Sequence, residues 1–190
     1  MPYGWNNTAP IRAVDPSDVN DIATTLRQHV AAWGQGSEIW DNTRRYHTNK
    51  TGAVELLQVV EIMGGEEFSY VYEYGGLVLG LLLASDSIGC LYIADLLAHP
   101  GTEGAGATLL EFAVNLSHQQ GYNGKLKLFS LNQNSSDFYL KMGFARSGPI
   151  KPNGGGDMTF DPASRDDLWA QTNDGWALKA YVGKRFAGAT

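Results

Sequence analysis

Residues 91–110 read LYIADLLAHPGTEGAGATLL, and this segment constrains the fold more than any other part of the chain. Its apolar first half predicts a strand, and a glycine-bearing turn then leads directly into a helix. Such a turn points several backbone N–H groups, and the positive end of the helix dipole, at one place where an anion can bind. Gly104 and Gly106 leave no side chain to block a close anion. The segment therefore predicts either a diphosphate cradle or a plain tight strand-to-helix turn.

Three kinds of phosphate-binding loop can be compared with this turn. A nucleotide-binding P-loop ends in Gly-Lys-Ser or Gly-Lys-Thr, whereas here Gly106 is followed by Ala107 and Thr108. A dinucleotide-binding fold places its glycine fingerprint after the first strand, whereas this turn follows several predicted strands. The third kind is the coenzyme A loop of acetyltransferases, and a second segment decides in its favour.

That second segment reads NQNSSDFYLKMGF at residues 132–144 and follows a predicted strand. It resembles the Asn-x-x-Ala-x-x-Leu/Phe-Tyr-x-x-x-Gly-Phe signature of the GNAT superfamily of N-acetyltransferases. Asn132, the Phe138-Tyr139 pair and Gly143-Phe144 all fall at the family's spacing. Together with the turn, the resemblance covers residues 91–144, and the order of the predicted elements extends it over roughly residues 10–160.

The resemblance implies how an acyl donor, acetyl-CoA, would be held. The backbone of three strand residues matches the stretch that pairs with the pantetheine arm: Leu96, Leu97 and Ala98. Six residues match the diphosphate turn: Thr102, Glu103, Gly104, Ala105, Gly106 and Ala107. Asn132 matches the residue that holds the pantetheine. Tyr139 matches the phenol beside the thioester sulfur, and a phenol with a pKa near ~10 can protonate a departing thiolate of similar basicity.

Two residues in the turn depart from the family pattern. The family usually carries Arg or Gln where this chain has Gly101, and often a basic residue where it has Glu103. A carboxylate beside a diphosphate is electrostatically unfavourable, although it suits a helix N-terminus. Backbone donors carry most of the contact at such helix ends, so they can still bind the diphosphate.

An acceptor amine must be neutral to attack, so a base or a water chain is required. Asp95 is our candidate, because it lies in an otherwise apolar strand where burial raises the pKa of a carboxylate. The alternative is that Asp95 is a structural or capping carboxylate. Glu61, Glu73 and Glu111 are further candidates, with Glu111 expected on the solvated face of its helix.

Patterning along the chain predicts the order β-α-α-β-β-β-α-β-α-β-β, a mixed α/β layer fold. The resemblance refines this to a GNAT fold: a mostly antiparallel central sheet with a splayed parallel pair and helices on both faces. Residues 68–74 and 77–84 are predicted to pair as a hairpin, and beyond about residue 161 a helix is predicted near 176–186. We therefore assign residues 1–160 to a GNAT acyltransferase domain and residues 161–190 to a C-terminal extension.

Composition argues against several classes of protein. A lone cysteine, Cys90, rules out an internal disulfide framework, and the four histidines show no ligand spacing, so no metal site is predicted. The longest apolar run is too short to span a bilayer, and the N-terminus lacks the features of a signal peptide, so a cytoplasmic location is expected. The net charge of −6 argues against a large nucleic-acid footprint.

The expected function is transfer of an acetyl group from acetyl-CoA directly to a primary amine of a small molecule or a protein. Neither a nucleic-acid partner nor a membrane is expected, and a homodimer is compatible with this prediction. The alternative, motivated by Gly101 and Glu103, is a catalytically weak GNAT-fold module that binds CoA or a protein partner for regulation. Acylation of aminoacyl-tRNA by a toxin of this superfamily is disfavoured by the acidic charge.

Overall fold

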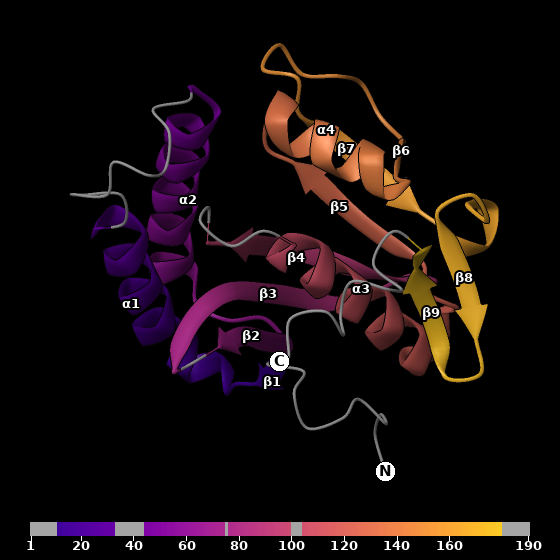
Figure 1. Cartoon of the computed structure of the whole chain (residues 1–190), viewed down its shortest axis with the longest axis horizontal. Helices are drawn as coiled ribbons and strands as arrows, with labels where there is room; N and C mark the ends of the chain where they lie inside the picture. Colours follow the sequence, from indigo (N-terminus) through magenta and orange to yellow (C-terminus); the bar gives the residue numbers. More distant parts are fainter. Residues whose placement is uncertain (1–10, 33–43, 75, 100–103, 180–190) are drawn as a thin grey trace, which may run out of the picture. The chain divides into compact units, whose positions relative to one another are not determined.

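The structure, a computed structural model, describes residues 11–32, 44–74, 76–99 and 104–179 (Figure 1). The strands are β1 (Ile11–Ala13), β2 (Phe68–Tyr74), β3 (Leu77–Ser87), β4 (Cys90–Ala98), β5 (Leu126–Ser130), β6 (Ala145–Arg146), β7 (Gly156–Phe160), β8 (Trp169–Thr172) and β9 (Gly175–Leu178). The α-helices are α1 (Val19–Ala32), α2 (Arg44–Met63), α3 (Ala105–Ser117) and α4 (Gln133–Met142).

Hydrogen-bonded neighbours in the main sheet follow the order β1-β2-β3-β4-β5-β7-β6. The pairs β1–β2, β2–β3, β5–β7 and β6–β7 are antiparallel, whereas β4 and β5 are parallel. The parallel ladder pairs 91–93 with 126–128. This arrangement confirms the predicted mixed α/β fold, with a mostly antiparallel sheet and one parallel pair.

The described chain divides into two compact units. The N-terminal unit comprises 11–84 and 95–109 without the gaps given above, and the C-terminal unit comprises 85–94 and 110–179. Strands β3 and β4 and helix α3 each contribute residues to both units. The predicted site residues are therefore divided as well, and each unit is described by itself.

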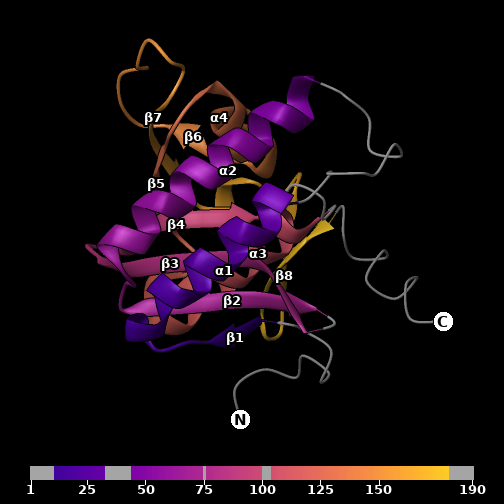
Figure 2. The same cartoon turned by 90° about the vertical axis from the view of Figure 1, so that its left-hand side faces the viewer.

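In the N-terminal unit, α1 and α2 lie side by side (Figures 1 and 2). The Asp15 side chain accepts the N–H of Ser17 at 2.9 Å, and Pro16 then opens a short 3-10 helix that leads into α1. The apolar stripe of α1 is fully buried and comprises Val19, Ala23, Leu26 and Val30. These positions recur at the three- and four-residue spacing of one helix face, as the sequence predicts.

The hairpin of β2 and β3 is confirmed, with Tyr74 paired to Leu77. Strand β3 runs to Ser87, three residues beyond the predicted end, and its segment from Gly80 to Ala84 is buried. Gly80 is required here, because a Cβ would lie 2.8 Å from the carbonyl oxygen of Leu97 and 2.7 Å from a Leu109 methyl group. The end of β4 and the first turns of α3 therefore pack closely on β3.

In the C-terminal unit, aromatic rings join α4 to the strands that follow it. Phe144 stacks on Phe160 with ring centroids 4.9 Å apart, and Phe160 in turn contacts Trp169 at 5.2 Å. The two strands that end the predicted order are present as β6 and β7, which pair antiparallel, although β6 has only two residues. Figure 1 shows α4 lying beside β5 and β7.

The prediction of a helix near residues 176–186 is wrong for the part that the structure describes. Trp176 lies in β9, which pairs with β8 as an antiparallel hairpin. The sequence carried a turn signal for it, because Asn173 and Asp174, the two residues of the turn, are of types that favour turns. Gly175 has a φ of 141°, and a Cβ there would lie 2.1 Å from Asn115 Oδ1. Close docking of the hairpin on α3 therefore requires glycine at this position.

Across the described ranges, none of the helices is both long and apolar enough to cross a membrane. Within the same ranges, His, Cys, Asp and Glu side chains do not gather in groups of three that could hold a metal ion. Cys90 is a free and buried cysteine.

Candidate functional site

Residues 104–107, the described part of the predicted diphosphate turn, lie at the N-terminus of α3 in the N-terminal unit. Gly104 has a φ of 81°, and its carbonyl accepts the N–H of Thr108 at 2.9 Å and the Thr108 hydroxyl at 3.0 Å. The three residues that follow Gly104 have no acceptor within the helix for their N–H groups. Gly104 itself has no side chain that could fold back to cap them. This segment, Gly104–Ala107 (the α3 turn), therefore presents backbone donors and the positive end of the helix dipole.

The end of β4 leads toward this turn. Leu97 is buried, whereas Leu96 and Ala98 are half-buried. The N–H of His99 donates to the carbonyl of Leu79 at 2.7 Å, which ties the chain to β3 immediately after β4 ends. The next residues, 100–103, lie outside the described residues, and with them the predicted contacts Thr102 and Glu103.

Asp95 has the environment that the sequence predicts for it. It is half-buried, and burial raises the pKa of its carboxyl to about 6, with the negative charge of Glu66 adding to the rise. Glu66 itself is fixed through its backbone: its N–H donates to Ser69 Oγ at 3.2 Å, and its carbonyl accepts from the same hydroxyl at 2.8 Å. A carboxyl with a pKa near 6 is a far better proton acceptor than an exposed aspartate.

The other carboxylates considered from the sequence are already engaged. Arg27 donates to Glu61 at 2.7 Å, and this hydrogen bond lowers the pKa of Glu61. Glu73 accepts from Arg12 at 2.9 Å. The expectation that Glu111 faces solvent is wrong: Glu111 is 1% exposed and accepts the N–H of Leu178 at 3.0 Å. Asp95 is therefore the best supported of the four as a base.

Two further titratable residues of the N-terminal unit were not singled out for catalysis from the sequence. One is Glu66, which follows a glycine pair and belongs to no motif. The other is His99, which is 8% exposed at the end of β4. Burial lowers the pKa of the His99 imidazole, and the charge of His29 acts in the same direction, against a hydrogen bond to the His29 backbone. The apolar strand before His99 was the one available signal that this histidine is buried.

In the C-terminal unit, Asn132 caps helix α4. The Asn132 side chain accepts the N–H of Ser135 at 3.1 Å, and the Ser135 hydroxyl accepts the N–H of Asn132 at 3.0 Å. The Asn132 half of this capping box gives a physical reason for an Asn at the start of the signature, and the Ser135 half is supplied by a residue that stands where the signature has Ala. The next residue, Ser136, is fully buried and bonds Ser130 of β5 at 2.7 Å and the carbonyl of Gly154 at 2.8 Å.

Tyr139 lies one turn further along α4 and is 7% exposed. Its ring contacts Phe138 and Phe144, each with a centroid separation of 5.2 Å. Gly143 ends the helix with a φ of 105°, and the N–H of Phe144 donates to the Tyr139 carbonyl at 3.0 Å. The aromatic ring is therefore buried between two neighbouring rings at the end of α4.

The structure thus groups Asp95, Leu96–Ala98 and the α3 turn in the N-terminal unit, and Asn132 and Tyr139 in the C-terminal unit. A model of the Acetyltransferase (GNAT) family matches residues 33–144, more than half of the chain. The chain belongs to the GNAT acetyltransferase family. The GNAT match contains both groups of residues and ends at Phe144, the last residue of the signature.

Solved GNAT structures resemble the chain at low sequence identity. The PaiA N-acetyltransferase from Thermoplasma acidophilum, solved in complex with coenzyme A, is 15% identical with a TM-score of 0.51, over 80% of this chain and 97% of that one. This likeness shows a shared fold. YncA from Salmonella typhimurium, a putative acetyltransferase solved with acetyl-CoA, is 17% identical with a TM-score of 0.46, over 80% and 92% of the two chains. A GNAT acetyltransferase from Brucella melitensis in complex with acetyl-CoA is 21% identical with a TM-score of 0.42, over 81% and 96%. No curated protein sequence matches the chain significantly.

Proposed function

We propose that this GNAT chain is an acyl-CoA-dependent N-acyltransferase that moves an acetyl group from acetyl-CoA directly to a primary amine of a small molecule or a protein. The proposal rests on the α3 turn, which follows β4 inside the range that the family model matches. The first N–H groups of α3 have no acceptor within the helix, so they are suited to bind an anion. The neighbours solved with CoA or acetyl-CoA agree with this choice of co-substrate.

The residues of the α3 turn fit a diphosphate. Two glycines in four residues keep the backbone accessible, and Gly104 adopts the left-handed conformation that glycine tolerates best. The N–H groups of Ala105, Gly106 and Ala107 would hold the phosphate oxygens, with Thr102 and Glu103 as the remaining turn residues. The backbone of Leu96–Ala98 would pair with the pantetheine arm, and Asn132 would hold it from α4.

Acetyl-CoA, when bound, supplies an acetyl thioester whose sulfur leaves as a thiolate. In the proposed reaction the Tyr139 hydroxyl donates its proton to that thiolate, and Asp95 accepts the proton that the amine must lose. The acetyl carbon forms its bond to the amine nitrogen as the carbon–sulfur bond breaks, so no acyl group is carried by the protein. The buried Cys90 has no role in this scheme.

The half-buried acid Asp95 suits this task because its carboxyl titrates near 6. Above that pH it is ionised and can accept a proton, and below it the group is protonated and inactive as a base. The proposal assigns this chemistry to residues 1–160 and leaves residues 161–190 as a C-terminal extension. A homodimer is compatible with it, as is a cationic acceptor drawn to a chain with a net charge of −6.

The test is release of free thiol from acetyl-CoA in the presence of a panel of alkyl amines, amino acids and lysine-containing peptides. A thermal-shift measurement with coenzyme A runs beside it. Turnover with at least one amine, lost in Tyr139→Phe, supports the proposal. Binding of coenzyme A without turnover across the panel indicates the regulatory module instead. A folded chain that binds no coenzyme A contradicts both functions.

A further inference from the structure

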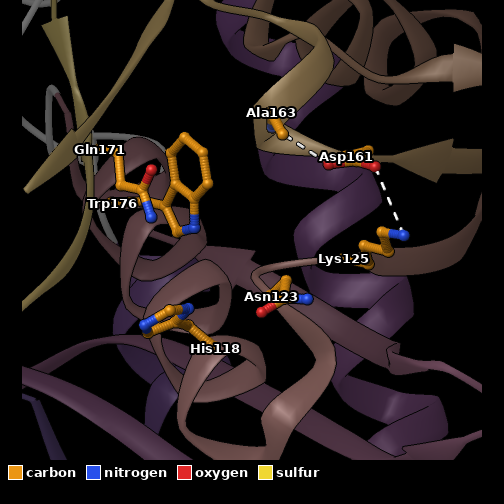
Figure 3. Close-up of a pocket in the computed structure, with 7 residues that line it drawn as sticks. All are labelled: His118, Asn123, Lys125, Asp161, Ala163, Gln171 and Trp176. Atoms are coloured by element: carbon orange, nitrogen blue, oxygen red, sulfur yellow. Dashed lines mark hydrogen bonds and ion pairs between the residues drawn. The ribbon is translucent and has the colours of Figure 1, made fainter.

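A pocket of about 280 Å³ lies wholly within the C-terminal unit and contains none of the proposed acyltransfer residues (Figure 3). Residues of the turn after α3, of β8 and β9, and of the segment after β7 line it. They are His118, Asn123, Lys125, Asp161, Ala163, Gln171 and Trp176 (the Trp176 pocket). Its size suits a small metabolite better than a drug-sized ligand or a peptide.

The backbone of Trp176 is fixed by one buried side chain. Asn115 Oδ1 accepts the Trp176 N–H at 2.8 Å, and Asn115 Nδ2 donates to the Trp176 carbonyl at 2.9 Å. Trp176 is itself 9% exposed, so its indole has a defined position in the wall of the pocket. Figure 3 shows the nitrogen edge of this indole turned toward the space near Asn123.

This indole nitrogen is unusual because it lacks a partner. Trp176 Nε1 is buried and donates no hydrogen bond to any of the described residues, and His118 Nδ1, in the same pocket, is buried and unpaired in the same sense. Trp169, in the same hairpin, shows the usual arrangement for a buried indole: its Nε1 donates to the Met142 carbonyl at 2.9 Å. Buried polar groups without partners are rare and call for an explanation, such as a ligand or an ordered water.

A pair of opposite charges forms another side of the pocket. Lys125 Nζ lies 3.6 Å from Asp161 Oδ2, and the two side chains are 48% and 39% exposed. This separation is longer than a charge-assisted hydrogen bond, and a loose, exposed pair of this kind contributes little stability. The other Asp161 oxygen accepts the N–H of Ala163 at 3.0 Å and so fixes the direction of the carboxylate. Lys125 can therefore turn to a ligand at a small cost in free energy, while Asp161 offers its second oxygen in a fixed direction.

We propose that the Trp176 pocket binds a small zwitterion of the amino-acid class. The ligand carboxylate accepts hydrogen bonds from Trp176 Nε1 and Lys125, and its ammonium group is held by Asp161. His118 Nδ1, the second buried atom without a partner among the described residues, forms a further hydrogen bond with the ligand. Gln171 pairs directly with Trp176 across the β8–β9 hairpin, so its side-chain amide lies next to the bound ligand.

The charges favour a zwitterion over a simple anion or cation. A carboxylate alone would gain Lys125 but would lie close to Asp161, and an amine alone would meet the opposite problem. A ligand with both charges forms two favourable pairs, and it also fills the unused hydrogen-bonding capacity of the indole. This inference does not depend on the proposed acyltransferase function.

Isothermal titration calorimetry of the intact chain with each of the common L-amino acids tests the proposal. We expect saturable binding for at least one of them, and weaker binding for its α-amide, which lacks the carboxylate, and for its N-acetyl derivative, which lacks the ammonium group. Absence of saturable binding for every amino acid at millimolar concentration overturns the proposal, as does an N-acetyl derivative that binds as tightly as its parent.

Two matched variants identify the site. Trp176→Phe removes the indole N–H and should raise the dissociation constant about tenfold, the scale of one hydrogen bond to a charged group. Trp169→Phe makes the same chemical change in the neighbouring strand, outside the pocket, and should leave ligand affinity unchanged. Asp161→Asn keeps a residue able to cap Ala163 but removes the charge, and it should weaken binding by a similar factor. Equal affinity in all three variants would place the ligand elsewhere and overturn the assignment.

Melting temperatures measured without ligand test whether Trp176 Nε1 lacks a hydrogen-bond partner. Trp169→Phe breaks an existing hydrogen bond and should lower the melting temperature, whereas Trp176→Phe removes a donor without a partner among the described residues and should lower it less. Both variants lose the same ring volume, so packing effects are similar. An equal or larger loss in Trp176→Phe would mean that this nitrogen is already satisfied, and the pocket would lose its reason to take a ligand.

Discussion

Helices α3 and α4 begin in opposite ways. Helix α4 is capped by protein groups: Asn132 and Ser135 satisfy each other's N–H, and the N–H of Gln133 donates to the Asn153 carbonyl at 3.0 Å. Helix α3 begins at Gly104, whose carbonyl serves Thr108 but which has no side chain to cap the residues that follow. The start of α4 is completed by groups of the chain itself, whereas in our proposal the first N–H groups of α3 bind the diphosphate.

This difference between the two helix starts separates a region that would act through its backbone from one that would act through its side chains. At α3 the backbone carries the proposed chemistry, so side-chain changes that do not add bulk should matter little. At α4 the N-terminus is closed by the chain's own groups, and in the proposed reaction this region contributes side chains, the Tyr139 phenol and the Asn132 amide. Removing the Tyr139 hydroxyl oxygen should therefore lower turnover strongly. Coenzyme A affinity at the α3 turn should instead respond mainly to added side-chain volume.

The largest expected effect is at Tyr139. Tyr139→Phe keeps the ring and its contacts with Phe138 and Phe144 but removes the transferable proton, so turnover should fall on the order of 10²-fold. The high-pH limb of the rate profile should also move, because the phenol must be protonated. Steady-state thiol release, with the folded fraction checked by thermal melt, measures both. Normal turnover with an unshifted profile in a folded variant removes Tyr139 from the mechanism.

The next effect concerns Asp95, whose carboxyl binds a proton in the folded chain up to a pH of about 6. Because this pKa is raised from its ordinary value of 3.8, the folded state holds more protons than the unfolded state between these pH values, and stability falls as pH rises through that window. Asp95→Asn removes the burial of a charge, so it should raise the free energy of unfolding by roughly 1–3 kcal/mol above about pH 7, and by nothing below about pH 4.

Denaturant unfolding of parent and variant across this range measures the difference. A gain that is independent of pH would mean that Asp95 does not titrate as described. The same pair of proteins tests the proposed base: the parent should lose turnover below a pH of about 6, and Asp95→Asn should be slow at every pH.

The third prediction tests whether backbone N–H groups of the α3 turn hold the diphosphate. Replacing Gly104 with Val should weaken coenzyme A binding, but its φ of 81° would also strain any other residue, so lost affinity could reflect a distorted turn. Gly106→Val is the sharper change, because Gly106 already lies within the helix. It should raise the dissociation constant for coenzyme A about tenfold or more, since it obstructs a charge-assisted hydrogen bond.

The control for this variant is Gly52→Val in α2, where an added Cβ meets nothing within 4 Å. It carries the same helix-propensity change without touching the turn, so coenzyme A affinity should stay at the parent value. A folded Gly106→Val protein with unchanged affinity would show that the α3 turn does not hold the diphosphate.

The parts of the fold and of the candidate site that could be predicted from the sequence are those set by residues close together in the chain. The β2–β3 hairpin, the α3 turn and α4 each depend on residues that are close in the chain: a glycine, a capping pair, an apolar stripe. The β8–β9 hairpin was not predicted: the sequence pattern indicated a helix from about residue 176, where β9 lies, and no strand at 169–172, where β8 lies.

Long-range partners could not be predicted in the same way. Glu111 looks like a surface residue in its own helix, and its acceptor role depends on Leu178, 67 residues away. The rise in the pKa of Asp95 was expected from its apolar strand, but the contribution of Glu66 was not. The Trp176 pocket combines four separate segments, and none of them carries a motif.

A smaller effect separates the two roles of Asn132. Asn132→Ser keeps a hydroxyl that can cap α4, whereas Asn132→Ala loses the cap and should lower the free energy of unfolding by about 1 kcal/mol. If the Asn132 amide also holds the pantetheine, both variants should bind coenzyme A a few-fold more weakly. If Asn132 only caps the helix, Asn132→Ser should match the parent in both affinity and stability.

The smallest expected effect is at Glu103, which directly precedes Gly104 in the sequence. If backbone donors dominate at α3, a side-chain charge there should only modulate affinity. Glu103→Arg replaces a repulsive charge with an attractive one and should tighten coenzyme A binding about fivefold at low salt, and less as salt screens the interaction. Glu67→Arg, at an exposed position elsewhere in the N-terminal unit, makes the same change in net charge and should have little effect on affinity. Unchanged affinity of Glu103→Arg at low salt would mean that Glu103 does not face the diphosphate. If Glu103→Arg raises coenzyme A affinity by a factor far larger than the loss caused by Gly106→Val, side-chain charge rather than the backbone governs binding at the start of α3. The contrast with α4 would then fail.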